Sequence, residues 1–137
     1  MAGIRYGLEV YRDATADLAS LMASDRKAAL RIAVVLQEIG DDQNLLDLLN
    51  VEGHEDERFG VKAVVELQRS RWNAYRLTIK DLELGTILPY RVLYAFDGKC
   101  RIYHVLAVKP RGIAYNAATI DRAIAACRSL GIEPLPR

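Results

Sequence analysis

The spacing of apolar residues changes along the 137-residue chain, and this change predicts its secondary structure. Residues 4–11 alternate apolar and polar side chains, which is typical of a strand with one buried face. Residues 14–23 instead carry apolar side chains at helical spacing. The apolar segment that follows has a cap at Ser24 or Asp25 and a stop at Gly40. We therefore expect a strand followed by an antiparallel helical hairpin.

Alternation returns after residue 60, where four strands are expected, at 61–68, 75–80, 90–96 and 100–108. Before them, residues 41–50 can add one or two helical turns, and residues 51–60 are expected to form an exposed loop. The last two strands flank Asp97-Gly98, a pair that favours a tight hairpin because glycine accepts a positive φ. A final helix is expected between a cap at Asn116 and a stop at Gly131.

This order of elements predicts an α+β fold in a single domain spanning residues 1–137. An N-terminal strand and helical hairpin are expected to pack on one face of a mainly antiparallel four- to five-stranded sheet, with a C-terminal helix. The composition, 51% hydrophobic and 27% charged, is that of an ordinary globular protein. No apolar run approaches the ~20 residues of a membrane span, and residues 1–11 are too polar for a signal peptide. We therefore expect a cytoplasmic protein that does not associate with membranes.

The cysteines and histidines show no spacing typical of a metal or redox site. Cys100 and Cys127 lie far apart, so both are expected to be small buried apolar residues. His54 falls in the expected surface loop and His104 on an apolar strand face, with no further ligands at metal-binding spacing. The sequence therefore predicts no metal site and no cofactor.

Charge is distributed unevenly along the chain. Residues 41–60 contain seven acidic residues and one basic residue, whereas residues 61–111 contain ten basic and four acidic residues. Blocks of like charge often mark interaction surfaces, so basic strands beside an acidic connector indicate an anion-binding face. A solvated sheet edge with ordinary charges gives the same pattern, and charge alone leaves both interpretations open.

Three segments carry a more specific signal: Trp72–Lys80, Tyr90–Gly98 and Val105–Arg111, the last followed by Tyr115. Their sequences, order and spacing resemble the RelE/ParE toxin superfamily of bacterial type II toxin–antitoxin systems, on its RelE/HigB-like side. The resemblance implies a RelE-like fold and a toxin that cleaves mRNA, usually in the ribosomal A site, and so inhibits translation. It implies mRNA, the ribosome and a neutralising antitoxin as partners, and it leaves a homo-oligomer open.

The resemblance also assigns six site residues: Arg91, Arg111 and Tyr115 as catalytic, and Arg76, Lys80 and Lys109 as substrate-binding. RNA supplies its own 2′-OH as the nucleophile, so the protein must hold the phosphate, stabilise its developing charge and move two protons. An arginine fork suits the phosphate, and a tyrosine can stack on a base or relay a proton. Two positions depart from the family pattern. Thr78 replaces a lysine of a well-studied branch, and Pro110 stands where histidine or lysine is common.

Two other functions stay open on the sequence alone. A ParE-like inhibitor of DNA gyrase has no evident need for Arg91, Arg111 and Tyr115 together, so the trio favours RNA. A non-catalytic binding module with the same fold is favoured by the two departures. Purely structural roles compete as well, since Arg91 could pair with Glu66 or Asp81 and Tyr115 could pack against the last helix.

Overall fold

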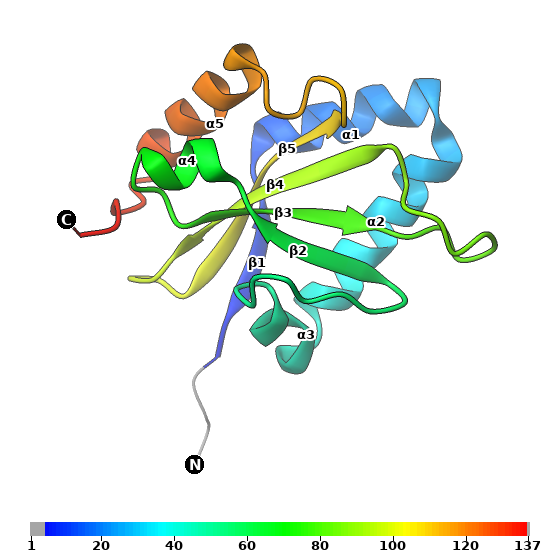
Figure 1. Cartoon of the computed structure of the whole chain (residues 1–137), viewed down its shortest axis with the longest axis horizontal. Helices are drawn as coiled ribbons and strands as arrows, with labels where there is room; N and C mark the ends of the chain where they lie inside the picture. The colour runs from blue at the N-terminus through cyan, green and yellow to red at the C-terminus, as the bar shows by residue number, and fades with distance from the viewer. Residues whose placement is uncertain (1–4, 137) are drawn as a thin grey trace.

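Ten helices and strands make up the part of the chain that the structure, a computed structural model, describes, residues 5–136 (Figure 1). In chain order they are β1 (Gly7–Val10), α1 (Arg12–Ser24), α2 (Arg26–Gly40), α3 (Gln43–Leu48), β2 (Phe59–Ala63), α4 (Val65–Arg69), β3 (Ala74–Ile79), β4 (Tyr90–Asp97), β5 (Ile102–Pro110) and α5 (Ala117–Ser129). The α+β class expected from the sequence is confirmed. Ile4, placed in the first strand by its alternation, lies outside the described residues.

The strands form one five-stranded sheet in the order β1-β5-β4-β3-β2. The sheet is mixed rather than antiparallel, because β1 pairs in parallel with β5 whereas the other three pairings are antiparallel. The hairpin of β4 and β5 contains one irregularity: Leu93 faces Ala107 and Tyr94 faces Val105, so Leu106 is an extra residue in β5. Such a bulge bends the strand locally and increases its twist.

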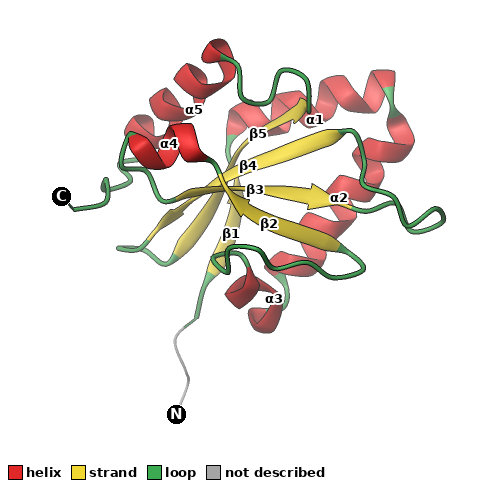
Figure 2. Ribbon diagram, in the orientation of Figure 1, coloured by secondary structure: helices red, strands yellow, loops and turns green. Residues whose placement is uncertain are grey.

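Helices cover both faces of the sheet, which corrects the expectation of helices on one face (Figure 2). Helices α1, α2 and α3 pack on the face that carries Leu77 and Tyr94, and this forms the larger core. Helices α4 and α5 pack on part of the opposite face, against Leu93 and Leu106. Because successive residues of a strand point to opposite sides, neighbouring positions of β4 serve two separate cores.

The strand expected over residues 61–68 is wrong in its second half. Strand β2 ends at Ala63, and the chain continues as the short helix α4. Both patterns fit this stretch, because Val64 and Leu67 lie three residues apart and are buried together in the core beneath α5. The loop expected at 51–60 is also too long, since Phe59 is fully buried and belongs to β2.

Most of the expected turn and cap chemistry is confirmed. The side chain of Asp25 accepts a hydrogen bond at the start of α2, and Asn116 does the same for α5. Gly131 follows α5 with φ of 70°, a conformation that glycine adopts without strain. Gly40, by contrast, is the last residue of α2 rather than the residue after its cap. In the β4–β5 turn the positive φ falls on Arg101, at 59°, and not on Gly98.

The two cysteines differ in environment: Cys127 lies on the buried side of α5, as expected, whereas Cys100 is exposed, so the expectation of burial is wrong there. Among residues 5–136, no helix is both long enough and apolar enough to cross a membrane.

Candidate nucleic-acid interface

Two arginines on neighbouring strands and one tyrosine meet on the face of the sheet that α4 and α5 leave partly uncovered. Arg76 lies on β3 opposite Leu93 of β4, and Arg91 lies two residues before Leu93 on the same strand face. Tyr115 lies in the segment between β5 and α5. Nη1 of Arg76 donates a hydrogen bond of 2.7 Å to the Tyr115 hydroxyl oxygen, and its guanidinium carbon lies 5.6 Å from the centre of the ring. Arg76 therefore fixes the orientation of Tyr115.

Arg91 is half-buried and donates hydrogen bonds to backbone carbonyl groups. Its Nη1 donates to the carbonyl oxygens of Leu88 and Tyr90, at 3.1 and 3.0 Å. Burial, together with the charges of Arg76 and Arg111, lowers the pKa of Arg91, while Tyr115 acts in the opposite direction. The guanidinium still stays charged at neutral pH, because the pKa of arginine starts above 12.

Arg111 completes the cluster from the solvent side. Its side chain is exposed, and its backbone N–H donates to the carbonyl of Pro89 at 3.1 Å, which holds this segment beside the start of β4. In the described part of the chain, Arg76, Arg91 and Arg111 form no ion pair with a carboxylate. The pairing of Arg91 with Glu66 or Asp81, left open by the sequence, does not occur.

Two donors of the cluster are buried without a partner. The Nε atoms of Arg76 and Arg91 are inaccessible to solvent and have no hydrogen-bond acceptor among the described residues. A buried donor without an acceptor costs about 1–3 kcal/mol, so native structures rarely leave one in place without a reason. Both guanidinium groups are therefore incompletely satisfied by the protein itself.

Lys80, expected to bind substrate, contacts the loop before β2 instead of the arginine cluster. Its Nζ donates to the carbonyl oxygen of Asp56 at 2.7 Å and lies 3.4 Å from Oε1 of Glu55. Its side chain is 19% exposed. Lys80 thus fixes the loop before β2. That loop also contains His54, which is half-buried rather than on the surface and lies 2.7 Å from Asp56 through Nε2.

The side chain of Lys109 also has a partner outside the arginine cluster, although Lys109 lies directly opposite Arg91 in the pairing of β4 with β5. Its Nζ is 3.3 Å from Oδ1 of Asp17, a residue of α1 whose carboxylate is 8% exposed. Asp17 also accepts hydrogen bonds from Arg122 of α5 and from the backbone N–H of Val108. We call Asp17, Lys109 and Arg122 the Asp17 junction, because it ties α1, β5 and α5 together.

The Asp17 junction shifts the ionisation of its acid. Burial acts to raise the pKa of Asp17, but the hydrogen bonds from Arg122 and Val108 and the charges of Arg122 and Lys109 outweigh it. The pKa of Asp17 therefore lies below its ordinary value of 3.8. At neutral pH the junction holds an ionised carboxylate between two cations, and this carboxylate offsets part of their positive charge.

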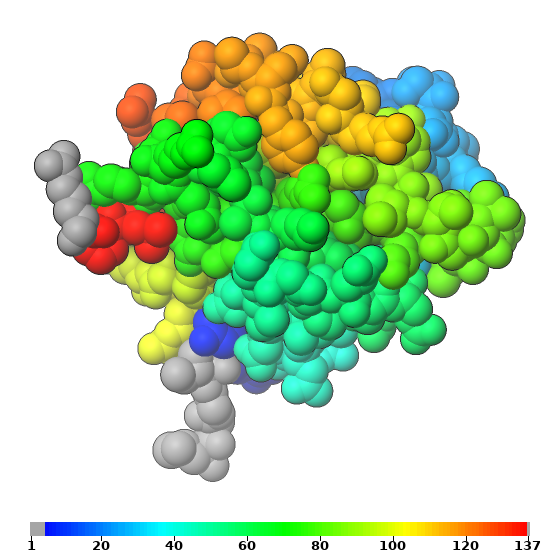
Figure 3. Space-filling view, in the orientation of Figure 1, coloured from blue at the N-terminus to red at the C-terminus, as the bar shows by residue number. Residues whose placement is uncertain are grey.

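A hollow of about 160 Å³ adjoins the arginine cluster. Figure 3 shows the surface of the molecule from the side on which α4 and α5 lie. Arg76 and Arg91 form one side of the hollow, and Gly60, Thr78 and Lys62 line the strand surface. Sequence reasoning missed Lys62 and Gly60. The signal was the pairing of β2 with β3, in which Lys62 faces Arg76 and Gly60 faces Thr78. Neither pairing is visible before the register is known.

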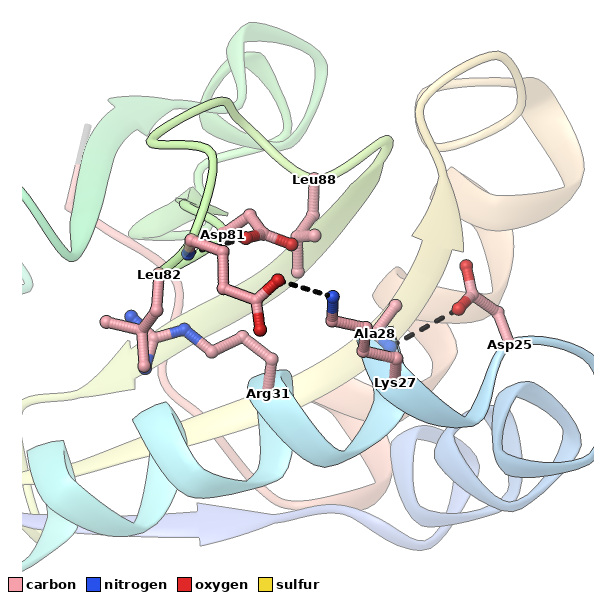
Figure 4. Close-up of a pocket in the computed structure, with 8 residues that line it drawn as sticks. Asp25, Lys27, Ala28, Arg31, Asp81, Leu82 and Leu88 are labelled. Atoms are coloured by element: carbon pink, nitrogen blue, oxygen red, sulfur yellow. Dashed lines mark hydrogen bonds and ion pairs between the residues drawn. The ribbon is translucent and has the colours of Figure 1, made fainter.

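A larger hollow, of about 340 Å³, lies between α2 and the loop at 81–88 (Figure 4). Its charges are mixed and largely paired: Lys27 lies 3.2 Å from Glu83, and Nε of Arg31 donates to the carbonyl of Lys80 at 3.0 Å. Asp25 accepts a hydrogen bond from the Tyr90 hydroxyl. This site has no surplus of positive charge, so it attracts a phosphate less than the arginine cluster does.

No group of three or more histidine, cysteine, aspartate or glutamate side chains that could hold a metal ion occurs within residues 5–136. Comparison of the chain with protein-family models, curated proteins and solved structures finds no match. The chemistry of the site is therefore argued from its own geometry.

Proposed function

We propose that this protein is the toxin of a type II toxin–antitoxin system, an endoribonuclease that cleaves mRNA on the ribosome. One observation carries the proposal: Arg76 and Arg91 lie beside Tyr115 at the edge of a hollow, Arg111 lies near Arg91, and none of the three arginines has a carboxylate partner among residues 5–136. Gathering like charges is unfavourable by itself: burial lowers the pKa of Arg91 most, and the charges of Arg76 and Arg111 lower it further. A bound phosphodiester would relieve the repulsion between the three guanidinium groups.

The donor geometry supports a phosphate ligand. A guanidinium group offers its N–H donors in a planar fork, which matches two oxygens of a phosphate. Nε of Arg76 and of Arg91 is inaccessible to solvent and has no acceptor among the described residues, so the Nη donors of each fork are the ones available to a phosphate. A phosphodiester has oxygens enough to accept from both side chains.

The reaction that fits this set needs no nucleophile from the protein. The ribose 2′-OH attacks the adjacent phosphorus, the bond to the 5′ oxygen breaks, and the products are a 2′,3′-cyclic phosphate and a 5′-OH. Arg76 and Arg91 stabilise the charge that develops on the phosphorane, and Arg111 assists at the leaving oxygen. Since the oxygen of Tyr115 accepts from Arg76, its own O–H remains free to orient the reacting groups.

Translation is the proposed target because the resemblance to RelE-type toxins points to mRNA in the ribosomal A site. Arg111 and Tyr115 both lie close enough to Arg91 to affect its pKa. The proximity of these three residues supports the RNA-cleaving branch over a gyrase inhibitor. A cognate antitoxin is the partner that this function requires, since free toxin would stop growth.

The test is to induce the protein alone in bacteria and map new mRNA 5′ ends. Arg91→Ala is compared with Lys99→Ala, which removes an exposed cation in the turn after β4, outside both the arginine cluster and the Asp17 junction. We expect cuts within translated codons that persist in Lys99→Ala and disappear in Arg91→Ala and Arg111→Ala.

Three other outcomes would contradict the proposal. Wild-type cleavage by both arginine variants would remove these residues from the site. Growth arrest with altered supercoiling and without cuts would favour a gyrase inhibitor. Absence of both arrest and cuts would favour a non-toxic binding module.

A further inference from the structure

Gly60 lines the hollow beside the arginines, and a larger residue at this position would have to displace its neighbours. A Cβ added to Gly60 would lie 2.9 Å from Oγ1 of Thr78 and 3.5 Å from the carbonyl oxygen of His54. Any larger side chain would fill the space between β3 and the loop before β2. At about 160 Å³ the hollow is smaller than the roughly 300–1,000 Å³ of typical small-molecule sites, so it suits one flat ring system rather than a whole nucleotide.

The two ends of the hollow differ in charge. Arg76 and Arg91 line one end. At the other end Glu55 pairs with Gly60 in an isolated bridge outside β2, and its side chain is 63% exposed. Nζ of Lys80 lies beside one carboxylate oxygen of Glu55 and donates to the carbonyl oxygen of Asp56. This lysine therefore holds the Glu55 carboxylate, a hydrogen-bond acceptor, at the edge of the hollow.

The walls fit a heteroaromatic ring. Ile87, which is 46% exposed, supplies an apolar surface, and Thr78 supplies a hydroxyl that can donate or accept. RNA-binding proteins read unpaired bases by stacking and by hydrogen bonds to their Watson–Crick edges. A base in this hollow would have its phosphate at the arginine end and its polar edge toward Glu55.

We propose that the hollow over Gly60 is a nucleobase subsite that prefers guanine, an inference that rests on the proposed ribonuclease function. An ionised carboxylate presents two acceptors and no donor. Guanine presents two adjacent donors on its Watson–Crick edge, N1–H and the N2 amino group, and its O6 can accept from Thr78. Uracil instead has a single N–H between two carbonyl oxygens, which the carboxylate of Glu55 repels.

The test is an NMR titration of the ¹⁵N-labelled protein with the 3′-monophosphates of guanosine, adenosine, cytidine and uridine. We expect guanosine 3′-monophosphate to bind about tenfold more tightly than the uridine compound, the size of effect that one hydrogen bond to a charged group gives. The backbone amide signals of Gly60 and Thr78 should shift most.

Glu55→Gln should remove most of the preference, because it replaces one acceptor by a donor at nearly constant shape. Glu57→Gln is the matched control: it makes the same change in an exposed residue of the same loop that does not line the hollow. Gly60→Val should block all four bases, and Thr78→Val should weaken guanosine binding if the glycine variant does not fold.

Equal binding of the four nucleotides, a preference for uridine, or a guanosine preference that survives Glu55→Gln would each overturn the subsite. The two proposals fail separately. Arg91→Ala should weaken all four nucleotides alike through the phosphate. Cleavage of mRNA without base preference overturns only the subsite, whereas guanosine preference in a protein that never cuts RNA overturns only the ribonuclease.

Discussion

Two basic clusters lie on either side of the β4–β5 pairing and differ in one respect, the presence of an acid. Lys109 and Arg91 face each other across these strands, yet Lys109 reaches the carboxylate of Asp17, whereas Arg91 donates to backbone carbonyls and forms no ion pair with a carboxylate among residues 5–136. In the Asp17 junction a carboxylate from α1 offsets part of the positive charge, and the arginine cluster has no such acid among the described residues. The number of basic residues therefore says little about an anion site; the positions of the carboxylates decide it.

The difference implies opposite contributions to stability. The Asp17 junction satisfies its carboxylate with donors from β5 and α5, elements far from α1 in sequence. Both clusters contain a buried Nε without an acceptor among residues 5–136, in Arg122 as in Arg76 and Arg91, but in the arginine cluster like charges lie together with no carboxylate partner among these residues. Functional sites often retain such unfavourable arrangements because a ligand compensates them. We expect mutations in the junction to affect folding and mutations in the cluster to affect activity.

The largest effect is expected from Asp17→Ala. Removing one partner of a buried ion pair leaves the other charge uncompensated, which typically costs about 3–5 kcal/mol. Urea unfolding should therefore show a loss of this size in the free energy of unfolding. Asp17→Asn, which keeps the shape and part of the hydrogen bonding, should lose less. A loss no larger than that of a surface substitution would contradict the structural role assigned to the junction.

The lowered pKa of Asp17 predicts that the stability of the folded protein depends on pH in the acid range. The pKa of Asp17 is lower in the folded state than its ordinary 3.8, so the unfolded chain binds more protons in acid. Its contribution to stability is complete above about pH 4 and is lost as the pH falls through the folded-state pKa. Asp17→Asn should therefore flatten the acid limb of stability against pH, measured by thermal unfolding; an unchanged limb would show that other groups dominate it.

Arg91→Ala is expected to have the opposite effect to Asp17→Ala: a large loss of activity with a small change in stability. Cleavage should slow about 10²–10³-fold, as when one donor to a developing oxyanion is removed. The free energy of unfolding should change by less than about 1 kcal/mol, because the lost carbonyl contacts are offset by relief of repulsion from Arg76 and Arg111. Arg91→Lys should keep the charge but lose the fork, and recover only part of the rate. If Arg91→Ala unfolds the protein instead, the cluster is a structural element.

A smaller effect is expected in the salt dependence of binding to an uncleavable single-stranded oligonucleotide with 2′-O-methyl groups. Each phosphate contact adds about 0.7 to the slope of log affinity against log salt. Arg76→Gln or Arg91→Gln should reduce the slope by about that amount. Lys109→Gln should leave it unchanged, because Asp17 already neutralises this lysine. Equal slopes for all three variants would remove the distinction between the clusters.

The smallest effect is expected from Glu83→Gln. Glu83 forms an ion pair with Lys27, and their side chains are 74% and 71% exposed, respectively. Solvent screens such pairs, and many contribute nothing measurable. Thermal unfolding at low and moderate salt should not distinguish the variant from the wild type. A clear loss would show that the loop at 81–88 stabilises α2 more than its exposure indicates.

The sequence predicts much of the scaffold because local chemistry decides it. The caps at Asp25 and Asn116 and the alternation of β3 and β4 depend on neighbours within a few residues. Helix α4 was missed because Val64 and Leu67 fit a strand or a helix equally well, and only burial beneath α5 chooses between them.

The site was predicted in part for a different reason. Arg76, Arg91, Arg111 and Tyr115 lie together as their motifs implied. Lys80 and Lys109 contact other partners, which the sequence pattern could not show because these partners, Asp56 and Asp17, lie in distant segments of the chain. A strand pattern shows which way a cation points from the sheet, but it does not show which acid will meet it.

The hydrogen bond from Val108 to Asp17 has a further consequence for the open side of β5. Strand β1 pairs only with Ile102–Val105, so the remainder of that strand edge has no neighbouring strand. Unpaired backbone groups at such an edge can template the addition of a strand from another molecule, the first step in aggregation. Because the N–H of Val108 donates to Asp17, it is not available to a strand of another molecule. Asp17 therefore opposes aggregation through pairing at this edge of the sheet.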